Sequence, residues 1–312
     1  VKLFEDKSRG IDSFAIGGGL KKVVIAGVDP FYLGKNILYH NPAGAAALAL
    51  AGRSHNIGGQ NFQVEAIVLP ARYRDLEREG DEGMVEEVFK QYVDSTDAGY
   101  QAVDLVLGLW RNHERKFTVN RFAARNRGGI SDNENRPSPP RNPSFKISSS
   151  LVGKAFYETA LDTNKIVPAA NPDTHGFDVI FDNAFEYKWT DAASVEQTSS
   201  FAEADNADGQ AKVETGAHPN NGSLNGTIPT ALSGTTTPKD TDITSVRGSA
   251  SNYLGNEIFY RLMRMKPAGN AAIKVGLISL PKVQEDLDEF VAADNKSVID
   301  ALLEEIANLL TP

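Results

Sequence analysis

Short apolar strands alternate with helical segments through the first 110 residues, and this alternation restricts the fold more than any other feature of the chain. The run from Lys22 to Gly27 is rich in β-branched residues and ends at a glycine, which is typical of a buried strand in a parallel sheet. Residues 64–69 and 102–109 have the same character and predict two further strands. The first third of the chain therefore predicts several buried strands in one sheet.

Helices are expected between these strands. Asn41 followed by Pro42 predicts a helix start, because Asn is a favoured cap and Pro suits the first helical position. A second helix is expected at residues 82–93, with its apolar residues on one face. This order of elements predicts an α/β fold, which we expect to be a three-layer sandwich around a mainly parallel twisted sheet.

The second half of the chain changes character after a proline-rich stretch. A helix is expected at 152–161, and the polar segment at about 168–247 is expected to be a long irregular or β insertion. Within that insertion, residues 177–181 and 185–189 predict a small hairpin. Periodic segments then return, and they predict a helix at 254–265, a strand at 273–280 and a helix at 295–310. We expect one α/β domain over residues 21–312, preceded by an N-terminal arm at 1–20.

Composition excludes several classes of protein. The chain has no cysteine, so disulfides, thiolate metal sites and thiol chemistry are excluded. The net charge of −9 argues against nucleic-acid binding, and no apolar run approaches the ~20 residues that span a bilayer. The histidines are scattered, and no phosphate-binding or dinucleotide motif is in place, so neither a metal nor a cofactor is expected. The start at Val1 instead of methionine favours a removed leader, and hence an exported, extracellular protein.

Several segments resemble one known family when they are taken in order. Residues 24–31 read V-I-A-G-V-D-P-F and are followed by Asn41-Pro42, and residues 103–109 read V-D-L-V-L-G-L. The remaining segments are 117–133, 253–263 and 275–281. Together they are similar to pyroglutamyl peptidase type I, the pyrrolidone carboxyl peptidases. The resemblance covers about half of the chain and implies that family's α/β fold.

The resemblance also implies that the family's catalytic residues are lost. The family uses a Cys nucleophile, a His base and a Glu that orients the His, and a thiolate attack needs all three roles. The matching positions here are Gly255, Ser279 and Asn120. An arginine near the family's pocket is replaced by Gly129. We therefore expect the fold of a peptidase with a degenerate triad.

The leading interpretation is a non-catalytic protein that serves in binding or self-assembly. The N-terminal arm at 1–20 and the insertion at 168–247 are the added material, so we expect a homo-oligomer built through these two segments. It would be a subunit of an extracellular oligomer or filament, without nucleic-acid partners and with no ligand identified.

Two other interpretations stay open. One is a hydrolase or peptidase with a rebuilt site, in which Ser279, His113 and Glu114 form one conceivable arrangement. The other is a binder of pyroglutamyl-type ligands that does not turn them over. The residues that are expected to line such a cleft are Phe31, Asn41, His113, Glu114, Ser251 and Asn256.

Overall fold

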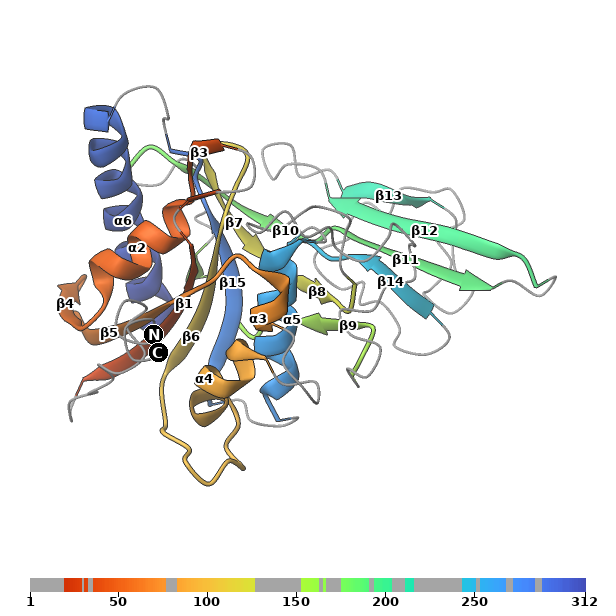
Figure 1. Cartoon of the computed structure of the whole chain (residues 1–312), viewed down its shortest axis with the longest axis horizontal. Helices are drawn as coiled ribbons and strands as arrows, with labels where there is room; N and C mark the ends of the chain where they lie inside the picture. The colour runs from red at the N-terminus through yellow and green to blue at the C-terminus, as the bar shows by residue number, and fades with distance from the viewer. Residues whose placement is uncertain are drawn as a thin grey trace.

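The computed structural model describes residues 20–29, 31–32, 36–76, 83–126, 153–162, 165–166, 175–190, 194–203, 211–215, 243–250, 253–267, 272–283 and 288–312. Its centre is a seven-stranded sheet with the strand order β10-β7-β15-β6-β1-β5-β4 (Figure 1). The strands are β1 (Lys21–Val28), β4 (Arg53–Ile57), β5 (Gln60–Leu69), β6 (Leu105–Arg111), β7 (Lys116–Asn120), β10 (Asp178–Asp182) and β15 (Lys274–Leu280).

The sheet is mainly parallel. Strands β5, β1, β6 and β15 run in one direction, whereas β4 and β7 run against their neighbours β5 and β15. The central strands are buried on both faces, because helices cover the sheet on either side. This arrangement confirms the predicted α/β fold.

Two groups of helices complete the layers, and Figure 1 shows them on opposite sides of the sheet. One group is α2 (Pro42–Leu50) and α6 (Asp288–Leu310), and the other is α3 (Tyr73–Leu76), α4 (Met84–Val93) and α5 (Leu254–Met265). Residues of β6 alternate between the two cores: Leu107 and Leu109 pack on the α2–α6 side, and Trp110 packs on the α4–α5 side. The helices that were predicted at 82–93, 254–265 and 295–310 are confirmed.

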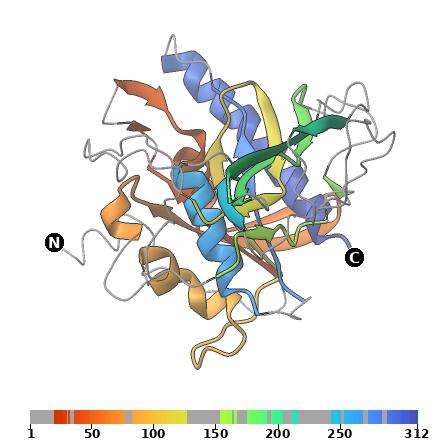
Figure 2. The same cartoon turned by 90° about the vertical axis from the view of Figure 1, so that its right-hand side faces the viewer.

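A second sheet projects from this body, and in Figure 2 it points toward the viewer. It is antiparallel, with the order β13-β12-β11-β14. Its strands are β11 (Phe185–Thr190), β12 (Glu196–Glu203), β13 (Ala211–Thr215) and β14 (Ile243–Arg247). A small aromatic cluster that includes Phe122, Phe156 and Phe185 joins it to the pair β8 (Phe122–Ala124) and β9 (Phe156–Glu158). The second sheet thus lies almost wholly in the segment that was expected to be an insertion.

Two local predictions are wrong. The helix expected at 152–161 is replaced by β9, because Phe156 packs in the aromatic cluster while its strand pairs with β8. The hairpin of 177–181 with 185–189 does not form either: β10 pairs with β7, and β11 pairs with β12 and β14. Residues 183–184 carry the chain from one sheet to the other, and Ala184 N donates to Asp182 Oδ1 at this corner (2.8 Å).

Apart from Leu20, the expected N-terminal arm lies outside the described residues.

Candidate functional site

The three positions that the resemblance assigns to the family's triad lie on the same side of the sheet, and two of them are in contact. Ser279 lies near the carboxyl end of β15, in register with Trp110 on β6 and Thr118 on β7. Alternation places Ser279 on the face covered by α4 and α5, and Gly255 lies in the first turn of α5. Asn120 and Ser279 therefore lie on the neighbouring strands β7 and β15, and β6 separates them from β1.

Asn120 and Ser279 contact each other directly. Asn120 Nδ2 donates to Ser279 Oγ at 3.0 Å, and it also lies 3.2 Å from Thr118 O and 3.4 Å from Leu277 O. Only 1% of Asn120 and 7% of Ser279 is exposed. An amide and a hydroxyl carry no charge near neutral pH and neither is an effective base. The pair therefore holds β7 against β15 and supplies no general base.

Gly255 packs against the indole ring of Trp110. A Cβ atom added at Gly255 would lie 2.5 Å from Trp110 Cγ, which is closer than any real Cβ contact. The indole is itself held by an edge-to-face contact with Tyr253, with ring centroids 5.5 Å apart, and Tyr253 makes a similar contact with Tyr73 at 6.1 Å. The space that a side chain at position 255 needs is thus filled by Trp110.

Gly255→Ala is expected to lower the free energy of unfolding by about 1–3 kcal/mol, because the new methyl group overpacks the site against Trp110. Urea unfolding measures this change. In the double variant Gly255→Ala/Trp110→Leu the two effects should be less than additive, since the smaller side chain relieves the clash. Additive effects would contradict the proposed contact.

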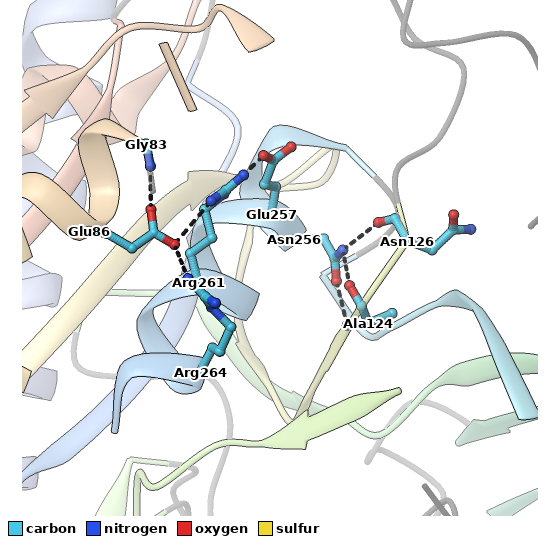
Figure 3. Close-up of polar contacts among 8 residues, drawn as sticks. All are labelled: Gly83, Glu86, Ala124, Asn126, Asn256, Glu257, Arg261 and Arg264. Atoms are coloured by element: carbon cyan, nitrogen blue, oxygen red, sulfur yellow. Dashed lines mark hydrogen bonds and ion pairs between the residues drawn. The ribbon is translucent and has the colours of Figure 1, made fainter. Parts of the chain in front are cut away.

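Asn256, one of the residues expected in a ligand cleft, instead binds the strand next to it (Figure 3). Its Oδ1 accepts from Ala124 N at 2.9 Å, and its Nδ2 donates to Ala124 O at 2.8 Å and to Asn126 O at 3.0 Å. The side chain is fully buried. These three hydrogen bonds fix the first turn of α5 to β8, so the amide is already committed within the protein.

His113 and Glu114 lie in the loop between β6 and β7. Glu114 forms an ion pair with Lys116 at 2.7 Å, and its carboxylate side chain is 66% exposed. Burial lowers the pKa of His113 below its ordinary value, and the cations Arg111 and Lys282 lower it further. A neutral His113 is therefore favoured near neutral pH.

Asn112 is the residue of this loop that contacts β7, and no sequence pattern indicated it. Its Nδ2 donates to Thr118 Oγ1 at 2.7 Å, and its Oδ1 accepts from His113 N at 2.7 Å. Thr118 is in register with Ser279. Asn112, Thr118, Ser279 and Asn120 thus form a chain of uncharged polar groups along β7 and β15.

The other predicted cleft residues have different placements. Asn41 Oδ1 accepts from Ala43 N at 3.1 Å, so this buried side chain caps α2. Phe31 belongs to β2 (Phe31–Tyr32), which pairs with β3 (Asn36–His40). Ser251 and Gly129 lie outside the described residues.

A buried charge network lies beside the site and was also missed. Arg261 of α5 binds Glu257 of the same helix through Nε and Glu86 of α4 through Nη1, each at 3.0 Å (Figure 3). Arg264 binds the same Glu86 oxygen at 3.1 Å, and the other oxygen accepts from Gly83 N at 2.9 Å. Burial alone would lower the pKa of Arg261, but the two carboxylates outweigh it and the pKa is raised. The network joins α4 to α5.

The described ranges contain neither a metal-binding cluster nor a membrane-spanning helix. No group of three or more His, Asp or Glu side chains is placed there to hold a metal ion. None of the helices in the same ranges is long and apolar enough to cross a membrane.

Comparisons with known proteins agree with this architecture. A crystal structure of pyroglutamyl peptidase I from Bacillus amyloliquefaciens has a TM-score of 0.51 at 17% identity, with 94% of this chain and 97% of that chain covered. A second crystal structure of that peptidase gives a TM-score of 0.50 at 17% identity, over 93% of this chain and 95% of the other. Pyrrolidone carboxyl peptidase from the hyperthermophile Pyrococcus furiosus gives 0.50 at 16% identity, over 93% and 98%. At such low identity the likeness establishes the fold alone.

The sequence itself matches a family model. Residues 10–165, which make up half of the chain, match the model described as PA0049, C-terminal domain. No curated protein matches the sequence. The chain therefore belongs to the PA0049 C-terminal domain family, and it has the pyroglutamyl-peptidase-like fold that its sequence predicts.

Proposed function

We propose that this protein is a non-catalytic relative of pyroglutamyl peptidase that serves in self-assembly. The observation that carries the proposal is the contact between Gly255 and Trp110, which leaves no room for a nucleophilic side chain at position 255. The neutral pair Asn120 and Ser279 stands where the family resemblance places an acid and a base. A nucleophile without a neighbouring base is not activated, so loss of both functions at one site argues against turnover.

The second sheet supports the assembly part of the proposal. We propose that residues 21–312 form a single domain. The second sheet and the residues that flank it, at about 168–247, would be an insertion into that domain. Among the described strands, β13 and β14 form the two edges of this sheet. An edge strand offers a row of backbone donors and acceptors to another chain. The sheet projects from the body (Figure 1), and we propose that a second copy pairs with its edge.

Light scattering over a range of protein concentrations, with electron microscopy of the same sample, tests the assembly. We expect a mass above that of the monomer that rises with concentration. Val213→Pro on β13 should abolish the association, because proline removes a backbone donor and disrupts an edge. Asn56→Pro on β4 is the matched control, because β4 is an edge of the other sheet. A monomer at every concentration would contradict the proposal, as would equal effects of the two substitutions in folded protein.

The alternative functions have less support in the geometry. A rebuilt hydrolase would need His113 beside Ser279, but the loop reaches β7 through Asn112. A binder of pyroglutamyl-type ligands would need free polar groups, but Asn41 caps α2 and Asn256 clamps β8. We therefore keep self-assembly as the proposed function.

A further inference from the structure

Three lysines bind the carboxyl end of α6, the helix that lies along one face of the central sheet (Figure 1). Lys21 is the first residue of β1 and Lys274 is the first residue of β15, so both stand at the same edge of the parallel sheet. Each lysine donates from Nζ to one of three consecutive main-chain carbonyls, namely Lys274 to Leu309, Lys21 to Leu310 and Lys165 to Thr311. We call these three lysine side chains the lysine clamp.

The lysine clamp brings positive charges together. Carbonyls at the carboxyl end of a helix carry partial negative charge, so cations that bind them stabilise the end of the helix. Three lysines on successive carbonyls must also lie close to one another, and like charges at short distance disfavour the charged forms. The clamp therefore stabilises α6 while it makes protonation of its own members less favourable.

Lys274 shows this effect. Its side chain is only partly exposed, and this burial lowers the pKa of Lys274. The neighbouring cations Lys165 and Lys21 lower the pKa further, whereas Asp162 and Asp104 act in the opposite direction and are outweighed. The neutral amine of Lys274 is therefore more populated at about pH 8 than that of an ordinary lysine.

A neutral amine beside fixed cations has a defined reactivity. Lysine becomes a nucleophile when a neighbouring cation or burial favours its unprotonated form. The other two members of the clamp, Lys21 and Lys165, attract anions to the same place. These two features together favour a reagent that carries both an electrophilic carbon and a negative charge.

We propose that Lys274 is a site of acylation by acyl phosphates, and that its acylation loosens the end of α6. Nζ of the neutral amine attacks the acyl carbon, and the bond from that carbon to the phosphate oxygen breaks. Phosphate leaves with the electron pair and the nitrogen loses a proton to water, so the products are an amide and inorganic phosphate. The amide carries no charge, which weakens the attraction of Lys274 for the negative end of α6.

Peptide mass spectrometry after brief treatment with acetyl phosphate tests the site. At about pH 8 Lys274 should be acetylated at least about twofold faster than Lys296, although the Lys296 side chain is 77% exposed. At about pH 11, where an ordinary lysine is largely neutral, exposure decides the rate and Lys296 should react faster. A faster reaction at Lys296 already at about pH 8 would overturn the proposal.

Two variants test the role of the neighbouring cations. Lys21→Met/Lys165→Met should slow acetylation of Lys274 at about pH 8 by about threefold or more, relative to Lys296 in the same sample. Lys22→Met is the matched control, because Lys22 is the next residue of β1 and alternation places its side chain on the other face of the sheet. Equal effects of the two changes, or no effect of either, would contradict the role of the clamp.

A second reagent tests the anionic class of donor. N-hydroxysuccinimidyl acetate is an uncharged acetyl donor, so the advantage of Lys274 over Lys296 should be smaller with it than with acetyl phosphate. An equal advantage with both reagents would show that charge does not select the donor.

Hydrogen exchange tests the effect on α6. Lys274→Gln removes the charge as acylation does, whereas Lys274→Arg keeps it. Deuterium uptake at residues 306–311 should be at least about threefold faster in the Gln variant than in the Arg variant. Equal uptake would overturn the loosening of α6. None of these outcomes depends on self-assembly, so the inference stands or fails separately from the proposed function.

Discussion

Replacing Arg261 with Met is expected to lower the free energy of unfolding by about 3–5 kcal/mol, the largest effect of any single substitution considered for this protein. The guanidinium is fully buried, and it is the cation nearest to Glu257 and Glu86. The substitution takes this buried cation away from Glu257 and leaves Glu86 with Arg264, and loss of one partner of a buried ion pair is costly because the interior solvates the remaining charge poorly. Urea unfolding, monitored by circular dichroism, measures the loss.

Two further variants separate the buried charge from simple loss of packing. The triple variant Glu86→Gln/Glu257→Gln/Arg261→Met removes the charges that Arg261 compensates, so it should recover a large part of the lost stability. Lys296→Met removes a cation from an exposed pair with Asp300 and should change stability by less than about 0.5 kcal/mol. A loss below about 1 kcal/mol for Arg261→Met would contradict the account of the network.

Asn256→Ala is expected to lower the free energy of unfolding by about 2–3 kcal/mol. The substitution removes three hydrogen bonds, and it leaves Ala124 N and the carbonyls of Ala124 and Asn126 without this partner in the interior. Because Asn256 ties α5 to β8, limited proteolysis should also cleave the variant faster near residues 121–126. Urea unfolding and the digestion pattern together measure the effect.

Asn56→Ala is the matched control for this prediction. Asn56 Nδ2 donates to Asn61 Oδ1 at 2.7 Å in the exposed hairpin of β4 and β5, where water replaces a lost partner. The same change of residue there should cost no more than about 0.5 kcal/mol. Equal losses at positions 56 and 256 would show that the buried clamp has no special role.

Much of the α/β body could be predicted from the sequence because its elements are local and periodic. Buried parallel strands appear as continuous apolar runs, and the cap Asn41-Pro42 marks a helix start in the chain itself. The shorter elements were not predicted, because they contain too few residues to show a periodic pattern. β7 has five residues, and β9 has three, so neither provides a period that distinguishes strand from helix.

The site was only partly visible in the sequence. The resemblance located Asn120, Gly255 and Ser279, and the structure brings Asn120 and Ser279 into contact. The contact between Gly255 and Trp110 joins distant parts of the chain, so no local pattern indicates it. The pair Glu257 and Arg261 has the i, i+4 spacing of a helical ion pair, but its third member Glu86 comes from another helix.

The proposed lack of catalysis at Asn120, Gly255 and Ser279 can be tested directly. Release of a fluorescent amine from a pyroglutamyl amide, followed with wild-type protein at high concentration, tests this claim most directly. We predict a rate equal to that of the buffer alone and unchanged by Ser279→Ala. Turnover that survives purification and is abolished by Ser279→Ala would contradict the account and establish a rebuilt hydrolase site.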